Sequence, residues 1–398
     1  MAPHKLPFHA DHIGSLIRPK SLSELQERAD AGEITPAELR EGQRATIAEV
    51  VSRQQAEGVR AITSGEFDRK YYFSGLFEKL DGFREVSPVP WDLARLSAPP
   101  IAALKKAGQH YPMAAVCEGK IGYRTSPYLD NWRLLRDTVP RELWAQCKFT
   151  MPPPCYFHLR LAPGKCYSAD AYSNDEEFFA DLARAYRKEL RTLYDEGLRN
   201  LQIDDPTLAY FCSDEMRESL RKDGVDPDAL FELYLKAHND CIADRPEGLH
   251  LTLKGPGRTG NFSKSMHFSE GSYENIAQRF FTTLNYDTFF LEYDNPRSGG
   301  FEPLRFLPVG KNVVLGVVTT KDPVLEDAGT IKDRVRQAVQ IIADGQGRPV
   351  SEAMRSVGVS PQCGFASVAV GAEGMTEDKM FEKLRLVNEV AKDLWPEE

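Results

Sequence analysis

Eight short apolar runs recur along the chain, and most of them end in polar residues or glycine. Helix-like stretches separate most of these runs. Such alternation predicts parallel strands joined by crossover helices, and eight units fit an α/β chain folded as a (β/α)8 TIM barrel. A doubly wound open sheet is the alternative that the pattern leaves open. The expected strands are residues 10–15, 61–66, 148–151, 201–205, 250–254, 289–294, 313–318 and 359–364.

The stretches between these runs carry local signals of helices. Thr35 precedes Pro36, a favourable pair for a helix start, and residues 173–176 (Ser-Asn-Asp-Glu) resemble a capping box. The expected helices are residues 21–31, 36–58, 175–197, 226–240, 272–284, 331–344 and 378–394.

No linker or internal repeat divides the 398 residues, so we interpret residues 1–398 as one TIM barrel domain. Residues 83–146 are irregular and rich in proline, apart from an apolar run at 116–123. We interpret this segment as an insertion between the second and third strands, built as a hairpin with helical turns.

Composition and charge disfavour several classes of protein. The chain has 50 Lys+Arg against 59 Asp+Glu, a net charge of −9, which argues against nucleic acid as a partner. No segment approaches ~18 consecutive apolar residues, so no membrane partner is expected, and the first residues lack the apolar region of a secretory signal. The seven cysteines include no CxxC pair, which indicates a reducing, cytoplasmic setting. We expect an enzyme with a small-molecule substrate, and leave oligomer formation open.

Polar side chains near the ends of the predicted strands mark the expected active site, because barrel enzymes build it at the carboxyl ends of their strands. An unpaired carboxylate at the end of a buried strand is costly, so each acid caps a helix, pairs with arginine or serves a site. Acids at three strand ends, with a histidine and a cysteine at two others, favour a site. The candidates are His12, Ser15, Glu66, Asp204, Asp205, His250, Glu292, Asp294 and Cys363.

Three of these candidates have the chemistry of zinc ligands. His250, Glu292 and Cys363 offer imidazole, carboxylate and thiolate, and three protein ligands with one open position describe a catalytic zinc. The alternatives are a core histidine at position 250 and a small buried apolar residue at Cys363.

Two local patterns are weaker indications of a ligand. His9 and His12, spaced as His-Ala-Asp-His, are a candidate for a metal site of the amidohydrolase kind. Residues 255–260 fit G-x-G-x-x-G, but Pro256 disfavours a phosphate-binding helix start, so we interpret the segment as a flexible turn.

Seven segments together resemble the cobalamin-independent methionine synthase family, specifically the single barrels equivalent to its catalytic C-terminal domain. They occur in the family's order and extend over nearly the whole chain. The resemblance implies a (β/α)8 barrel with zinc at the strand ends, where the metal lowers the pKa of a thiol substrate and delivers a thiolate to a methyl donor. The segments are residues 12–19, 64–69, 201–206, 250–252, 290–294, 314–321 and 360–367.

The resemblance also implies roles for individual residues. The family's H-x-C ligands fall on His250 and Thr252, and its remaining ligands fall on Glu292 and Cys363. Thr252 therefore replaces a zinc cysteine, but three metal ligands remain, and zinc is the expected cofactor. The residues implied to contact an amino acid substrate are Ile13, Gly14, Ser15, Glu66, Asp204 and Thr252. The expected catalytic residues are Glu66, Asp204, Asp205 and His12.

Three functions follow from this pattern. The first is zinc-dependent transfer of a methyl or other alkyl group to a small thiol such as homocysteine. The second, motivated by Thr252 and the altered segment after it, is a lyase, isomerase or hydrolase step on a carbonyl or epoxide substrate. The third is a degenerate barrel that binds a ligand without catalysis. The substrate, the methyl donor and the pathway stay open at this point.

Overall fold

The computed structural model describes residues 5–255, 273–295, 299–366 and 372–396. At its centre lies a parallel sheet of six strands, each paired with the next along the chain. Parallel neighbours of this kind require crossover connections. The strands are β3 (Lys148–Met151), β4 (Asn200–Asp204), β5 (His250–Lys254), β6 (Thr288–Glu292), β7 (Asn312–Val318) and β8 (Val357–Pro361).

Two further segments extend this sheet at its edges. Ala10 forms a parallel bridge with Val359 of β8, and Ile62 forms a parallel bridge with Cys147, directly before β3. Each segment follows the direction of its neighbour but is joined to it by an isolated bridge rather than by a continuous ladder.

A histidine joins these two edge segments. The Nε2 of His12 lies 2.7 Å from the carbonyl oxygen of Ala61, which connects the first segment to the second. The Leu16 amide also donates to the Gly65 carbonyl at 3.1 Å, so the two edge segments meet, and the predicted TIM barrel is confirmed. The strands predicted at 10–15 and 61–66 are reduced to single bridges.

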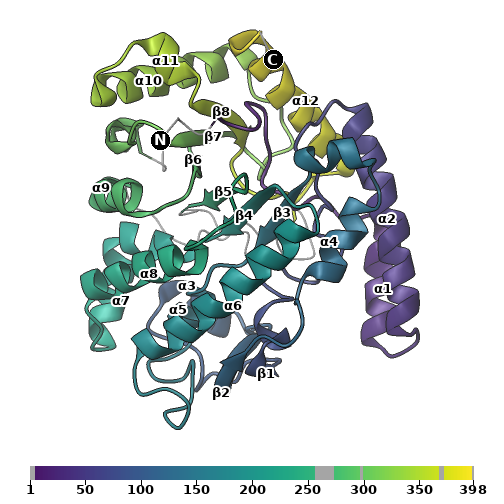
Figure 1. Cartoon of the computed structure of the whole chain (residues 1–398), viewed down its shortest axis with the longest axis vertical. Coiled ribbons are helices and arrows are strands. Elements are labelled where there is room, and N and C mark those ends of the chain that lie inside the picture. Colours follow the sequence, from purple (N-terminus) through teal and green to yellow (C-terminus); the bar gives the residue numbers. More distant parts are fainter. Residues whose placement is uncertain (1–4, 256–272, 296–298, 367–371, 397–398) are drawn as a thin grey trace.

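Helices surround the central strands (Figure 1). The seven predicted helices are present with ends shifted by a few residues, and the capping box at Thr35 is confirmed. At the other expected box, the side chain of Asn174 caps the helix by accepting from the Glu177 amide. The predicted helices are α1 (Lys20–Asp30), α2 (Pro36–Ala56), α6 (Asp175–Asp195), α8 (Pro227–Ile242), α9 (Glu274–Thr283), α10 (Ala328–Gln346) and α12 (Glu377–Leu394). Further helices are α3 (Pro99–Lys106), α4 (Leu129–Arg136), α5 (Tyr156–Arg160), α7 (Asp214–Lys222) and α11 (Val350–Met354).

The segment between the second and third barrel positions forms a small sheet of its own. Strands β1 (Asp81–Val86) and β2 (Ala114–Gly122) pair antiparallel, with α3 between them in sequence. This pair lies away from the barrel strands, beyond α5 and α6 (Figure 1).

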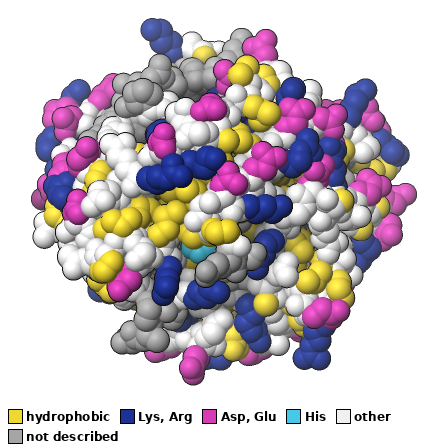
Figure 2. Space-filling view, turned by 90° about the horizontal axis from the view of Figure 1, so that it is seen from above, with side chains coloured by type: hydrophobic (Ala, Val, Ile, Leu, Met, Phe, Trp, Pro, Cys, Tyr) yellow, Lys and Arg dark blue, Asp and Glu magenta, His cyan; other side chains and the backbone are white. Residues whose placement is uncertain are grey.

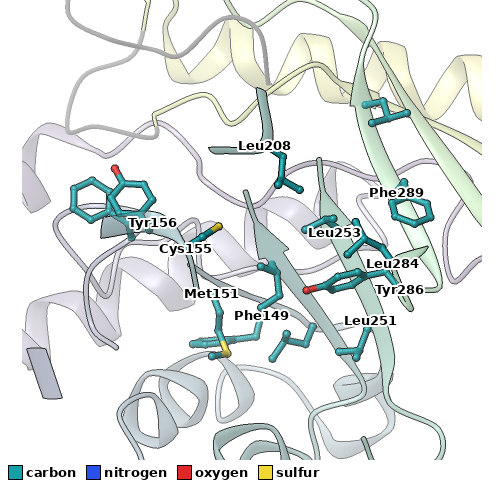
Figure 3. Close-up of a cluster of buried hydrophobic side chains, with 14 of the residues drawn as sticks. Phe149, Met151, Cys155, Tyr156, Leu208, Leu251, Leu253, Leu284, Tyr286 and Phe289 are labelled. Carbon is teal, nitrogen blue, oxygen red and sulfur yellow. The ribbon is translucent and has the colours of Figure 1, made fainter. Parts of the chain in front are cut away.

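Two separate apolar clusters fill the part of the chain that the structure describes. The larger one joins the sheet to the helices and includes Phe149, Leu251, Leu253 and Phe289, all nearly inaccessible (Figure 3). The smaller one consists of Leu6, Ile13, Phe290 and Val314. Because Phe289 and Phe290 are neighbours in one strand but belong to different clusters, the smaller cluster lies on the opposite face of the sheet, inside the barrel.

The outer surface carries charges of both signs. Figure 2 shows lysines and arginines interspersed with acidic side chains over the face that it presents. On that face no block of one sign stands out, as expected for a chain of moderate net charge.

Candidate functional site

The pleat of the barrel strands decides which polar side chains reach the interior. Since Leu251 and Leu253 pack toward the helices, Thr252 and Lys254 between and after them face inward. The same alternation holds in the neighbouring strands. The inward-facing residues of four strands are Lys148 and Thr150 of β3, Gln202 and Asp204 of β4, Thr252 and Lys254 of β5, and Phe290 and Glu292 of β6.

Glu66 stands just after the second barrel segment in a strained backbone conformation, with φ of 63°. Its Oε1 accepts hydrogen bonds of 2.8 Å from the Thr150 hydroxyl and from the Arg69 guanidinium. Its Oε2 is buried and has no hydrogen-bond partner within the part of the chain that the structure describes. Positive φ is costly for a residue with a side chain and persists where the surroundings impose it. One oxygen of Glu66 is thus fixed and the other is available to a ligand.

Asp204 ends β4 and lies close enough to Glu66 for the two charges to interact. Burial, together with the charge of Glu66, raises the pKa of Asp204 to about 7. Gln202 donates a 2.5 Å hydrogen bond to Asp204 Oδ1 and a 2.6 Å bond to the carbonyl of Ile13. Two buried carboxylates are therefore held near one another, and a ligand cation between them would relieve their repulsion.

The segment Ile13–Gly14–Ser15 lies beside these carboxylates. Gly14 has φ of 131°, and a Cβ built there would lie 2.8 Å from the Thr150 methyl group and 3.8 Å from Glu66 Oε1. Only glycine tolerates both the conformation and the close approach. Ile13 packs in the interior cluster, and Ser15 is buried, with its carbonyl accepting from the Phe365 amide.

Lys254 reaches across to the next strand at the carboxyl end of the barrel. Its Nζ donates a 2.6 Å hydrogen bond to Glu292 Oε1, and both side chains are nearly inaccessible. Burial lowers the pKa of Lys254, but the charges of Glu292 and Cys363 outweigh it, so that the pKa is raised overall. The ammonium is therefore charged and is held by the carboxylate predicted to bind metal.

Cys363 and Lys321 complete this group. Burial raises the pKa of the Cys363 thiol, although the charges of Lys254 and Lys321 act in the opposite direction. Burial lowers the pKa of Lys321, whose Nζ is inaccessible and without a hydrogen-bond partner in the described residues. Two lysines, a carboxylate and a thiol thus share one end of the barrel.

His250, the predicted metal ligand, lies outside this group in the structure. It is the first residue of β5, whereas Lys254 is the last, and four residues of strand span roughly 13 Å. Its Nε2 lies 2.9 Å from the Thr288 hydroxyl, at the start of β6. Thr252 faces the interior midway along the strand, between these two levels.

Asp205 points away from Asp204, so the structure separates two residues predicted to act together. Its carboxylate is fully buried and accepts hydrogen bonds of 2.8 Å from His238 Nε2 and 2.5 Å from the Thr207 amide. Burial raises the pKa of Asp205, but the hydrogen bond and charge of His238 lower it further, leaving it below its usual value. Asp205 therefore links the end of β4 to α8 and does not reach the interior.

His12 is held by the fold through one ring nitrogen, while its other nitrogen, Nδ1, is buried without a hydrogen-bond partner among the described residues. Burial and the nearby charge of Lys148 lower the pKa of His12 to about 3. The ring is consequently neutral, with its Nε2–H donated to the Ala61 carbonyl. The alternative metal pair with His9 does not form, since His9 contacts the Val357 carbonyl at 2.6 Å and stacks on Trp395.

The described residues offer zinc no suitable set of ligands at the strand ends. Glu292 is already paired with an ammonium, and Cys363 is accompanied by Lys254 and Lys321 in place of a histidine. A dication on the Glu292 carboxylate would lie about 4 Å from the Lys254 ammonium and be repelled by roughly 8 kcal/mol at an effective dielectric constant of about 20.

A second group in the described part of the chain has metal-binding atoms, with those of Cys155, Asp205 and His238 within 4.8 Å of one another. Both His238 nitrogens are already used, since Nδ1 lies 2.9 Å from the Tyr286 hydroxyl and Nε2 faces Asp205. Burial and the charge of Asp205 hold the pKa of the Cys155 thiol well above its usual value. A protonated thiol and a fully hydrogen-bonded imidazole form a closed network rather than a zinc site.

The remaining predicted features have less bearing on the site. Asp294 lies just beyond β6, where burial and the charge of Glu292 raise its pKa. The turn at 255–260 lies outside the described residues, except for Gly255, which donates its amide to the Phe290 carbonyl.

Four polar residues of the site were not among the residues predicted from the sequence: Arg69, Thr150, Lys254 and Lys321. Lys254 carried a usable signal, because a lysine within an apolar strand run demands an anionic partner when buried. Arg69 and Lys321 stand at the ends of two segments that carried the family resemblance. Thr150 had no local signal.

Comparisons with known sequences place the chain among methionine synthase relatives. No family model matches it. The uncharacterized proteins YxjH and YxjG of Bacillus subtilis are 33% and 35% identical over 392 and 393 residues, covering 98% of this chain and 96% of each relative. A methionine synthase of Saccharolobus solfataricus is 22% identical over 386 residues, covering 96% of this chain and 95% of that protein.

Solved structures agree with this placement. A protein of Listeria monocytogenes assigned to the vitamin-B12-independent methionine synthases superposes with a TM-score of 0.71 at 28% identity, covering 98% of this chain and 99% of the other. A B12-independent methionine synthase of Shewanella sp. W3-18-1, solved in complex with selenomethionine, superposes with a TM-score of 0.66 at 18% identity, covering 99% and 98%. Among the described residues, no helix is long and apolar enough to cross a membrane.

Proposed function

Because this chain belongs to the cobalamin-independent methionine synthase family, we propose that it is an enzyme that transfers a methyl or similar alkyl group to the sulfur of a small amino acid thiol such as homocysteine. The observation that carries this proposal is the pair of buried carboxylates, Glu66 and Asp204, beside the cluster of Lys254, Glu292 and Cys363. One group of residues suits an amine, and the other suits a sulfur anion.

The amine of the substrate would lie between Glu66 and Asp204. Glu66 Oε2 is buried without a hydrogen-bond partner in the described residues, and the pKa of Asp204 is raised to about 7. A substrate ammonium would donate to both carboxylates and favour the ionised form of Asp204. The amino acid bound in the Shewanella protein has the same amine group.

The surrounding residues would orient this amine. Arg69 and Thr150 fix Glu66 through its other oxygen, at 2.8 Å each. Gly14 leaves room for the ligand because a side chain there would enter the space next to Thr150 and Glu66. The predicted contacts with Ile13 and Ser15 would then be made through the backbone, since Ile13 packs into the interior cluster.

The sulfur of the substrate would face the lysines. The thiol first gives its proton to solvent. The sulfur then forms a bond to the alkyl carbon as the bond between that carbon and its donor breaks, and the donor leaves with the electron pair of that bond. A thiolate is the nucleophile, and neighbouring ammonium groups favour it over the thiol. Lys321, with a buried Nζ, and Lys254 are the charges in position to do so.

Calorimetric titration with L-homocysteine and L-methionine tests the amine site. We expect both to bind the wild-type protein, and Asp204→Asn and Glu66→Gln to weaken binding at least ~10-fold, equivalent to about 1.4 kcal/mol. The matched control is Glu189→Gln, which removes a buried carboxylate of the outer helix α6, bonded to Tyr123 and Ser126. Equal loss of affinity in all three variants would contradict the proposal.

Turnover is tested by incubating the protein with homocysteine and a panel of methyl donors and following thiol loss and methionine formation. Product formation with at least one donor, lost in Asp204→Asn, is the expected result. Binding without turnover across donors of sulfonium, methyl-folate and methyl-thioether type would leave a binding barrel, the non-enzymatic alternative.

One observation favours a second candidate, a lyase, isomerase or hydrolase step on a carbonyl substrate. Lys321 is buried, its pKa is lowered, and it lies near the second cation Lys254, which are the conditions that make a lysine amine nucleophilic. Borohydride treatment in the presence of small keto acids would then leave a stable adduct on Lys321, detectable by mass spectrometry of peptides. Lys321→Arg would abolish the adduct.

A further inference from the structure

The carboxyl end of the barrel already contains a cation. Lys254 follows Thr252 on the inward face of β5, and its Nζ lies 2.6 Å from Glu292 Oε1. The exposed fractions of the two side chains are 8% and 1%. Both charges are thus shielded from water and are paired with one another, so that they form a buried ion pair inside the barrel.

The groups around this pair already include a second ammonium, so an added metal ion would meet positive charge on two sides. Cys363 follows the end of β8 and interacts electrostatically with Lys254 and Glu292. Lys321 adds a second ammonium, with no hydrogen-bond partner for its Nζ in the described residues. A divalent ion placed on Glu292 would meet two ammonium groups at close range, and like charges in a buried site repel strongly.

The histidine that would compensate is at the other end of the strand. His250 begins β5 and contacts Thr288, while the position facing Glu292 is occupied by Lys254. Among the described residues, Glu292 and Cys363 belong to no group of three ligand atoms that lie within 4.8 Å of one another, whereas a catalytic zinc needs three protein ligands.

We infer that the ammonium of Lys254 takes the place of a metal ion in this barrel, so that the protein folds, binds its substrate and acts without zinc. Binding of the substrate without zinc rests on the proposed function, whereas the replacement of the metal by Lys254 does not. In this arrangement Lys254 neutralises Glu292 and leaves Lys321 as the charge that a substrate anion meets.

Elemental analysis of the full-length wild-type protein tests the metal directly. The protein is exposed to excess zinc, desalted and analysed, and we expect far less than one zinc per chain, with unchanged homocysteine affinity after treatment with a chelator. One zinc per chain, removed by Cys363→Ser, would overturn the inference.

Replacing Lys254 by histidine tests the role of its ammonium group. Lys254→His removes the ammonium and adds an imidazole beside Glu292 and Cys363, so we expect cobalt affinity to rise by roughly 100-fold or more. A cobalt–thiolate absorption band should appear and should vanish in Lys254→His/Cys363→Ser. A folded Lys254→His protein without this gain would contradict the inference, and folding is checked by circular dichroism.

The matched control is Lys148→His. Lys148 is also a buried barrel lysine in an ion pair, 2.6 Å from Asp11, but it lies at the start of β3. Lysine-to-histidine replacement there should give no cobalt–thiolate band. A wild-type protein that lacks zinc and also fails to bind homocysteine would leave the metal inference standing while contradicting the proposed function.

Discussion

The carboxylates of Asp204 and Asp205 lie on opposite faces of the same strand end. Asp204 faces the barrel interior with Gln202, whereas Asp205 faces α8 and pairs with His238 at 2.8 Å. The alternation of side chains along a strand separates the two neighbours. The surroundings disfavour the ionised form of Asp204 and favour the ionised form of Asp205, as their opposite pKa shifts indicate.

Asp204→Asn is expected to stabilise the fold while weakening ligand binding. The pKa of Asp204 is about 7 in the folded state against 3.8 for the free group. Unfolding therefore releases a proton between these values, and the free energy of unfolding falls as the pH rises from about 4 to about 7. The variant should be more stable than wild type above pH 7, by on the order of 4 kcal/mol. Urea denaturation as a function of pH measures this, and equal stability at every pH would contradict it.

Ligand affinity should follow the same ionisation in the opposite direction. A substrate ammonium binds the ionised form of Asp204, so affinity should rise with pH through about 7. In Asp204→Asn this pH dependence should disappear. Titration calorimetry about one unit below and above this pKa gives the comparison, and a wild-type affinity independent of pH would exclude Asp204 as an amine ligand.

Asp205→Asn should destabilise the fold and leave ligand affinity unchanged, the opposite of Asp204→Asn. It removes the charge from a fully buried carboxylate that accepts from His238 and Thr207, which should cost roughly 3 kcal/mol at neutral pH. Because the folded pKa is depressed, this contribution exists above the ordinary value near 3.8 and is lost as the pH falls below it. Homocysteine affinity should be unchanged. A loss of affinity in a folded variant would show that Asp205 does contribute to ligand binding.

Gly14→Ala should disrupt the amine site through steric overlap. A Cβ at this position would lie 2.8 Å from the Thr150 side chain in a backbone conformation that L residues rarely adopt. We expect a loss of about 1–3 kcal/mol of stability beyond the cost at a control glycine, with weaker ligand binding. Gly224→Ala is that control, since Gly224 also has positive φ but nothing within 4 Å. Equal effects at the two positions would mean that the close approach to Thr150 is unimportant.

Thr150→Val tests how Glu66 is held. The valine keeps the shape of the side chain but removes the 2.8 Å hydrogen bond to Glu66 Oε1, a bond to a charged group worth about 1.5–3 kcal/mol. It also removes the hydrogen bond that the Thr150 hydroxyl accepts from Arg69. We expect weaker homocysteine binding with the carboxylate itself intact. Thr282→Val is the matched control, because its hydroxyl donates only to the Gln278 carbonyl on exposed α9. Unchanged affinity would show that Arg69 alone orients Glu66.

Much of the fold could be predicted because the signal was local. Apolar runs between helical stretches located all six strands of the central sheet, and the cap at Thr35 marked the start of α2. The first two barrel segments were less predictable in extent, because the bridges of Ala10 and Ile62 depend on partners far away in sequence.

The site was predicted in part for the same reason. Glu66 and Asp204 were found because acids at strand ends are locally visible, and the structure brings them within electrostatic reach of one another. The predicted ligand His250 is the first residue of a five-residue strand, whereas Lys254 and its partner Glu292 lie at the other end, a separation that motif matching does not reveal. Which end of a short strand contributes to the site depends on the neighbouring strands. Here the ion pair of Lys254 with Glu292 marks the last residue of β5 as that end.

The first two barrel segments are joined to their neighbours by isolated bridges at Ala10 and Ile62, and so share fewer backbone hydrogen bonds with them than the continuous strands share with one another. Glu66 follows one of these segments, whereas Asp204 ends a strand paired on both sides. Segments with few backbone hydrogen bonds open most readily. An amino acid whose amine contacts both carboxylates would therefore connect the second barrel segment to the continuous strand β4. Its binding should slow amide hydrogen exchange most strongly in residues 10–15 and 61–66.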